Sequence, residues 1–282
     1  MHVHSLAAMV RPFVGRFASM VVLALAAQSW IATTASALLL PDPVHRWSFT
    51  GDTADTGTVG GATGTLNNGA AVVGNRLSLD GSNDFMLTSG MTDAISAKTL
   101  VSWVSLSTLA QASGSALTLQ TAGGATFDGI VYAERTANQW MNGSNGFSRS
   151  NGANNGGIAE SVIEPGEVMM AITYADASTL TIYRNGALYA TYNPGSLINY
   201  TGTAEALFGF RHTGGGGAPL GGFINEARIY NEALDALQIA ELFALGPDLL
   251  QTPSLVPEPS TIALLTFGAA LVVSRAKRRI ER

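Results

Sequence analysis

Short runs of alternating apolar and polar residues fill the middle of the chain, and glycine, asparagine or proline separates one run from the next. Alternation with a period of two is typical of β-strands that bury one face. Two of the runs, 98–106 and 167–174, are expected to be half-buried strands of this kind. The expected strands are 44–49, 76–80, 84–88, 98–106, 167–174, 179–184, 187–192, 206–211 and 223–230. About a dozen short strands at this spacing predict an all-β fold, an antiparallel two-sheet jelly-roll sandwich.

Two turns and one helix are expected among these strands. Asn185-Gly186 lies between two β-rich runs and predicts a two-residue hairpin, because both central positions of such a turn need positive φ. A second hairpin is expected at 81–83. Asp235 and Gln238 have the spacing of a capping box, which predicts that a helix begins after Asp235 and ends before the Gly-Pro pair at 246–247.

Composition and charge exclude several classes of protein. The chain has no cysteine, which excludes disulfide scaffolds, zinc–cysteine sites and thiol catalysis. Residues 38–274 contain 8 basic and 19 acidic side chains and no basic stripe. Nucleic acid is therefore not an expected partner, because that binding depends on neutralising phosphates.

The N-terminal segment 1–37 has the features of a signal peptide. Arg11 and Arg16 precede an apolar run at 17–27, and a small-residue Ala-Ser-Ala site lies at 35–37. This order is typical of a secretory signal, and cleavage is expected after residue 37. An uncleaved N-terminal membrane anchor is the alternative.

The C-terminus has three parts: a linker at 251–259, an uncharged apolar run at 260–274 and a basic tail at 275–282. A basic end favours the cytoplasmic side of a membrane. A helix of this length reaches about 22 Å, less than the roughly 30 Å of a bilayer core. The apolar run is therefore predicted to be a short anchor helix, which spans a membrane only if basic side chains snorkel or the bilayer thins.

The tail begins with Val256, Pro257, Glu258, Pro259 and Ser260, followed by the apolar and basic segments. In this order it resembles the PEP-CTERM sorting signal of Gram-negative bacteria. In that family an exosortase recognises the signal, and the proteins are linked to exopolysaccharide and biofilm matrix. The resemblance implies a precursor held in the inner membrane, processing by an exosortase, and a final place at the cell surface or in the extracellular matrix. A C-terminal anchor that is never cleaved is the alternative.

Four segments of the region 38–250 carry a second resemblance: 47–49, 79–85, 180–186 and 221–234. Through them this region resembles a LamG-like, concanavalin A-like lectin/glucanase domain. The resemblance implies two antiparallel sheets packed as a jelly roll. Members mostly bind glycans or proteins, some with a calcium ion, and some relatives hydrolyse polysaccharide.

No catalytic residues are expected. Glycoside hydrolysis needs two positioned carboxyl groups, and the Glu-x-Asp-x-(x)-Glu strand of the related glucanases does not occur here. The acidic cluster of Glu160, Glu164 and Glu167 is predicted to be a solvated face. The chain is therefore predicted not to be an enzyme.

Candidate sugar contacts lie in the middle of the chain, because sugars stack on exposed aromatic rings and hydrogen-bond to polar neighbours. The candidates are Trp140, Asn142, Tyr132, Arg149 and His212, with Phe147 in support. Two alternatives stay open. Trp140 is equally compatible with a core position, and His212 with an ordinary exposed loop.

Calcium is the metal that the sequence favours, because hard cations bind oxygen ligands in loops. The candidate ligands are Asp52, Asp55, Asn225 and Glu226, of which the last two match the place where relatives carry an Asp-Glu pair. The alternative is that Asp52 and Asp55 are turn residues.

The function expected from these features is that of an exported, non-catalytic module that binds extracellular polysaccharide or another partner. A glycoside hydrolase of the same fold and a purely structural matrix protein are the alternatives.

Overall fold

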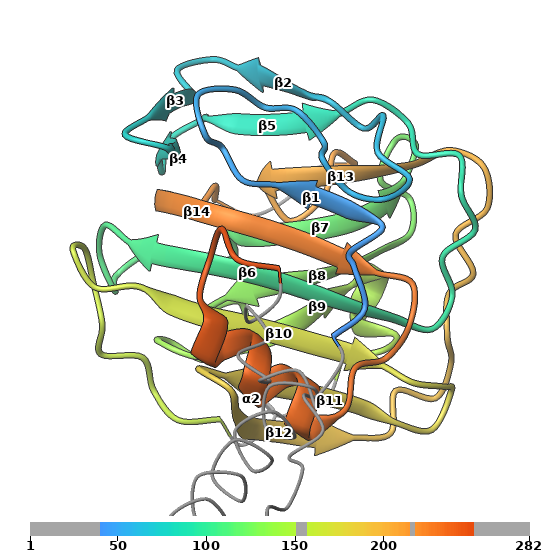
Figure 1. Cartoon of the computed structure of the whole chain (residues 1–282). Helices are drawn as coiled ribbons and strands as arrows, with labels where there is room; N and C mark the ends of the chain where they lie inside the picture. The colour runs from blue at the N-terminus through green and yellow to red at the C-terminus, as the bar shows by residue number, and fades with distance from the viewer. Residues whose placement is uncertain (1–39, 151–156, 215–217, 251–282) are drawn as a thin grey trace, which may run out of the picture. The chain divides into compact units, whose positions relative to one another are not determined.

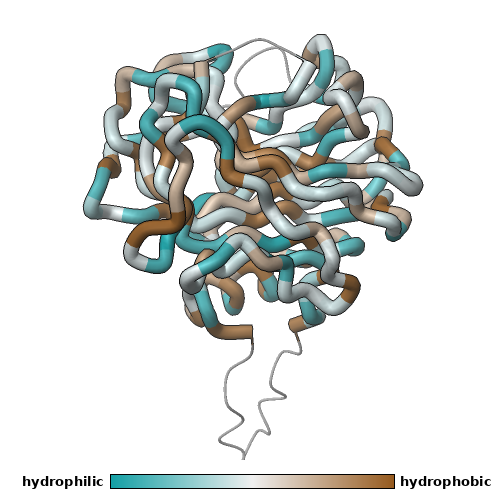
Figure 2. The backbone as a smooth tube through the Cα atoms, turned by 90° about the horizontal axis from the view of Figure 1, so that it is seen from above, coloured by the Kyte–Doolittle hydropathy of each residue, from teal (hydrophilic) through white to brown (hydrophobic). Residues whose placement is uncertain are grey.

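The computed structural model describes residues 40–150, 157–214 and 218–250, all within one compact unit. These residues form two antiparallel sheets packed face to face (Figure 1), which confirms the predicted two-sheet sandwich. Figure 2 shows short hydrophobic and hydrophilic segments following one another along the strands. This alternation places one set of side chains between the sheets and the other set outside them.

The larger sheet has eight strands. Their order is β12 (Ala187–Tyr192), β11 (Leu180–Arg184), β10 (Val168–Tyr174), β6 (Lys98–Leu106), β14 (Gly221–Tyr230), β4 (Arg76–Asp80) and β3 (Ala71–Val73), with β1 (His45–Trp47) also paired to β14. The smaller sheet has six strands, in the order β2 (Gly64–Asn67), β5 (Phe85–Thr88), β13 (Ala204–Gly209), β7 (Ser115–Thr121), β8 (Phe127–Tyr132) and β9 (Trp140–Ser144). A 3-10 turn, η1 (Asn145–Phe147), follows β9, and the helix α2 (Ala236–Leu245) follows β14.

The helix α2 covers part of the outer face of the larger sheet (Figure 1). Its buried side chains Ile239 and Leu242 pack with Trp103 of β6 and Met169 of β10 in a second apolar cluster. Strands β6 and β10 are consequently buried on both faces. The prediction that they are half-buried was wrong, because the local pattern does not show which sheet face a distant helix will cover.

Local turn and cap chemistry was predicted correctly at two places. Asn185 and Gly186 have φ of 49° and 76° and connect β11 to β12 as a hairpin. The Asp235 side chain accepts hydrogen bonds from the amides of Leu237 and Gln238, and the Gln238 side chain accepts one from the Asp235 amide. The predicted capping box is therefore confirmed.

The predicted hairpin at 81–83 was wrong. Strand β4, before the turn, belongs to the larger sheet, and β5, after it, belongs to the smaller one. The buried carboxylate of Asp84 accepts hydrogen bonds from the amides of Asp80 and Gly69, at 3.0 and 2.7 Å. These hydrogen bonds stabilise a corner at which the chain passes from the larger sheet to the smaller one.

The signal peptide, the sorting motif, the anchor and the basic tail predicted above lie outside the described residues. Within the described ranges, no helix has the length and apolar character needed to cross a membrane.

Candidate functional site

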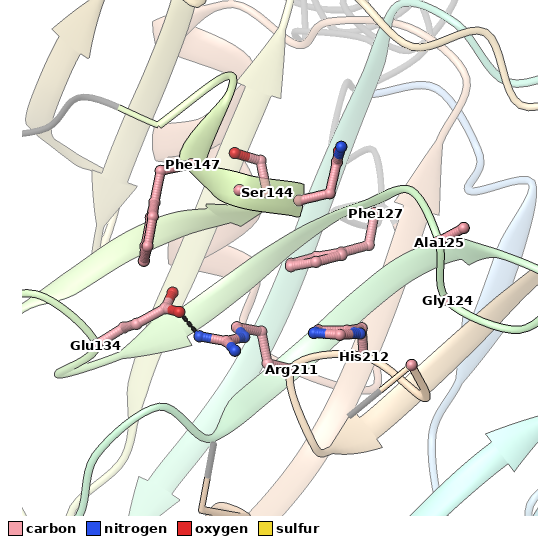
Figure 3. A pocket seen from close by; sticks show the side chains of 11 residues that line it. Gly124, Ala125, Phe127, Glu134, Ser144, Phe147, Arg211 and His212 are labelled. Carbon is pink, nitrogen blue, oxygen red and sulfur yellow. Dashed lines mark ion pairs between the residues drawn. The ribbon is translucent and has the colours of Figure 1, made fainter. Parts of the chain in front are cut away.

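A cavity of about 310 Å³ opens on the outer face of the six-stranded sheet (Figure 3). We call it the outer-face pocket, and its principal side chains are Phe127, Glu134, Phe147, Arg211 and His212. Successive residues of a strand face opposite sides of a sheet. Ile130 and Tyr132 of β8 belong to the core between the sheets. Phe127 is an odd number of residues away from each of them along the same strand, so its side chain lies on the outer face.

The pocket is assembled from segments far apart in the chain. Phe127 begins β8, Glu134 follows β8, and Phe147 lies in η1. Arg211 and His212 follow β13, and this segment is fastened to the sheet because the Thr118 hydroxyl donates to the Arg211 carbonyl at 2.9 Å.

Gly124, in the turn between β7 and β8, allows the turn to approach the 211–214 segment. Its φ is +72°, and a Cβ there would lie 2.7 Å from the Gly214 amide nitrogen and 2.8 Å from that of Thr213. Glycine is therefore the residue that permits this wall of the pocket.

An aromatic wall forms one part of the pocket. The His212 ring stacks on the Phe127 ring, with centroids 4.6 Å apart and planes 14° from parallel. Burial lowers the pKa of His212, and the nearby charge of Arg211 lowers it further, so the imidazole is neutral at pH 7. The Phe147 ring points toward Glu134 (Figure 3), and the Arg135 guanidinium lies 4.3 Å from its centroid.

An ion pair between Glu134 and Arg211 forms the polar part (Figure 3). The Glu134 side chain is only 3% exposed, and that of Arg211 is 19% exposed. The pair joins Arg211 Nη1 to Glu134 Oε1, and no described residue hydrogen-bonds Glu134 Oε2, Arg211 Nε or His212 Nδ1. Buried polar atoms are normally hydrogen-bonded. The pocket therefore presents buried polar groups that a polar ligand can satisfy.

The sequence-predicted sugar platform at Trp140 was wrong. Trp140, Tyr132 and Asn142 are fully buried, and the core alternative for Trp140 is the correct one. Tyr132 and Trp140 are cross-strand partners whose rings meet edge to face, with centroids 5.0 Å apart. The Trp140 indole donates to Glu160 at 3.1 Å, so its polar end is also satisfied inside the protein.

Arg149 is not an exposed ligand contact, because its side chain is only 5% exposed. It lies behind the pocket and positions its wall: it donates to the Phe127 carbonyl at 2.6 Å and to the Asn145 side chain at 3.0 Å. Asn142 in turn donates to the Arg149 carbonyl at 3.2 Å. Of the predicted sugar contacts, His212 and the supporting Phe147 line the pocket.

The predicted calcium ligands are not assembled into one site. Asp52 accepts a hydrogen bond from the Ala54 amide, which is the alternative turn role. Asp55 accepts from His45 at 2.6 Å and from backbone amides. In the described part of the chain, no group of three or more histidine, aspartate or glutamate side chains could hold a metal ion.

The other two predicted calcium ligands, Asn225 and Glu226, are also engaged inside the protein. The Glu226 carboxylate is buried between Arg46 and Arg228 and binds both. These two guanidinium groups hold the pKa of Glu226 low despite its burial. Asn225 hydrogen-bonds the Glu167 side chain, so neither residue is free to bind a cation.

The predicted solvated face at Glu160 was also wrong, because this carboxylate is buried and binds Arg184 through both oxygens, at 2.7 and 2.9 Å. Sequence reasoning missed Phe127, Glu134 and Arg211. The one available signal was their position at strand ends, where side chains from neighbouring strands meet.

Residues 79–240 match the concanavalin A-like lectin/glucanases superfamily, which agrees with the resemblance seen in the sequence. Among solved structures, domain 4 of AbnA, a GH43 extracellular arabinanase from Geobacillus stearothermophilus solved with arabinotriose, is similar with a TM-score of 0.55 and 16% identity. The alignment covers 72% of this chain and 98% of that domain.

A sialidase from Trypanosoma rangeli, solved with sialic acid, is similar with a TM-score of 0.54 and 16% identity. The alignment covers 77% of this chain but only 36% of the sialidase, so the chain spans about a third of that enzyme. At these identities the likeness shows the fold. No curated protein sequence matches the chain.

Proposed function

The chain belongs to the concanavalin A-like lectin/glucanases superfamily, and we propose that it is a non-catalytic carbohydrate-binding module whose sugar site is the outer-face pocket. The observation that carries the proposal is the pairing of an aromatic wall with buried polar atoms that have no hydrogen-bond partner among the described residues. A sugar ring offers an apolar face for aromatic contact and hydroxyl groups for hydrogen bonds. The similar arabinanase domain was solved in complex with arabinotriose, which supports a sugar as the ligand class.

The second candidate is a glycoside hydrolase. Such an enzyme needs two carboxyl groups about 5 to 10 Å apart. Among the described residues that line the pocket, Glu134 carries the sole carboxylate, and it is paired with Arg211. This arrangement favours binding over hydrolysis. Release of reducing sugar from polysaccharides by the purified full chain would support the hydrolase instead.

Binding is tested on a glycan array with the purified full chain and the variant Phe147→Ala. Loss of an aromatic contact of about 0.5–1.5 kcal/mol should weaken binding roughly two- to twelvefold. The matched control is Phe243→Ala, which removes an exposed ring from α2 on the other sheet. Equal binding by all three proteins would place the sugar elsewhere. Absence of binding to every glycan would favour the purely structural role.

Export and sorting are part of the proposal, with extracellular polysaccharide and an exosortase as partners. Their support is the signal-like segment 1–37 and the motif Val256-Pro257-Glu258-Pro259-Ser260. Intact mass and terminal sequencing of the native protein, from membrane and medium fractions, test this part. Loss of residues 1–37 and of the tail beyond about Pro257 is expected, whereas an intact tail in the membrane would indicate a simple anchor.

A further inference from the structure

In the outer-face pocket, the charges of Glu134 and Arg211 compensate each other. Several polar atoms of the pocket nevertheless have no hydrogen-bond partner among the described residues. From this we infer that the pocket selects a neutral sugar, bound through its hydroxyl groups, over an acidic sugar. The inference rests on the proposed function, because it names the class of carbohydrate for the same pocket.

Hydrogen-bonding capacity is the first argument. Glu134 Oε1 is paired with Arg211 Nη1, whereas Glu134 Oε2 as an acceptor and Arg211 Nε as a donor have no hydrogen-bond partner among the described residues. His212 Nδ1 is either donor or acceptor, depending on the tautomer. A hydroxyl group both donates and accepts, so neighbouring hydroxyls of a sugar can donate to Glu134 and accept from Arg211. A carboxylate group only accepts, so in the place of the donating hydroxyl it would leave Glu134 Oε2 without a donor.

Charge is the second argument. The charges of Glu134 and Arg211 compensate each other within the ion pair, and the lowered pKa of His212 keeps that ring neutral. A uronic acid carboxylate would therefore approach the Glu134 carboxylate, whose side chain is 3% exposed. Repulsion between like charges is strong where water is excluded. The Arg135 guanidinium beside the Phe147 ring is exposed, so solvent and salt screen its charge.

The size of the pocket limits how much of a glycan it holds. A volume of about 310 Å³ lies at the lower end of the range for ligand pockets. The pocket is partly open to solvent, so a longer chain can extend outward while one end is held. The expected ligand is therefore a terminal neutral ring or a short chain end.

The test compares neutral oligosaccharides with their uronic acid counterparts on one glycan array, using the purified full chain. The wild-type protein should bind the neutral members at least about tenfold more tightly. The variant Glu134→Gln keeps the shape but loses the charged acceptor, so neutral binding should fall about tenfold, and acidic glycans should gain affinity from the uncompensated Arg211. Glu232→Gln, an exposed change of the same kind beside β14, is the matched control and should behave as the wild type.

The outcomes separate the inference from the proposed function. Preference of the wild-type protein for acidic glycans would overturn the inference while leaving sugar binding intact. An unchanged preference of Glu134→Gln for neutral over acidic glycans would also overturn the inference, because the Glu134 carboxylate would then not determine which sugar is bound. Binding to no glycan would contradict the proposed function itself. The wild-type comparison needs no variant, so it decides the question even if Glu134→Gln does not fold.

Discussion

A buried cluster of charges lies directly behind the outer-face pocket, and its central anion is Asp128. The carboxylate accepts from Arg149 at 2.8 Å, from Lys98 at 3.0 Å and from the Tyr200 hydroxyl at 3.1 Å. All four side chains are buried. We expect Asp128→Asn to be among the most destabilising isosteric changes in the domain.

The magnitude follows from what the substitution leaves behind. Without Asp128, two cations remain in the core with no anion between them, and removing one partner of a buried ion pair typically costs about 3–5 kcal/mol. Domains of this size have a free energy of unfolding of about 5–15 kcal/mol, so the loss is a large part of the total. Burial already lowers the pKa of Lys98, and attraction to Asp128 only partly offsets this.

Lys98 also gives the prediction a pH dependence. A lysine whose pKa is lowered by folding binds fewer protons in the folded than in the unfolded protein, so its presence makes stability rise as the pH rises toward the unfolded value of 10.5. Removal of Asp128 lowers that pKa further. The deficit of Asp128→Asn should therefore be larger at pH 6 than at pH 9.

Urea unfolding followed by circular dichroism measures these differences. The double variant Lys98→Met/Asp128→Asn should recover at least about 1 kcal/mol relative to Asp128→Asn, because an apolar side chain needs no counter-ion. A loss below about 1 kcal/mol in the single variant, or no recovery in the double variant, would refute the reasoning that this cluster is held by charge.

Three further predictions concern the scaffold. Burial would lower the pKa of His45, but hydrogen bonds to Asp55 and Asp93 raise it above 6.5. The contribution of His45 to the free energy of unfolding should be full below pH 6.5 and lost as the pH rises through the folded-state pKa. The difference in urea unfolding between the wild type and His45→Gln should therefore shrink above neutral pH. Gly222→Ala should lower the free energy of unfolding by about 2–3 kcal/mol, because φ is +142° and a Cβ would collide with a carbonyl of β6; an unchanged urea midpoint would contradict this. Asp235→Ala should lower it by about 1 kcal/mol through loss of the capping box, and Asp176→Asn, in an exposed turn, should change it by less than about 0.5 kcal/mol.

Features with local causes could be predicted from the sequence. The Asn185-Gly186 hairpin and the Asp235 cap depend on side chains within a few residues, and both were confirmed. The corner at 81–83 depends on which sheet each flanking strand joins, and that choice is made by distant partners, β14 for β4 and β13 for β5. A turn sequence contains no information on those partners.

The site was harder to predict for the same reason. Polar neighbours around Trp140 suggested exposure, but pairing with β8 places the ring in the core opposite Tyr132. Glu134 and Arg211 lie far apart in the sequence and meet only because β13 and β8 both pair with β7. His212 was found because a lone histidine beside a glycine run is visible locally.

The most direct test of the central claim is a crystal structure of the full chain with the glycan that binds most tightly on the array. The account predicts a sugar ring in the outer-face pocket, in contact with Phe147 and with hydroxyl groups within hydrogen-bond distance of Glu134 and Arg211. Density for the sugar at any other face of the sandwich, with this pocket unchanged, would contradict it.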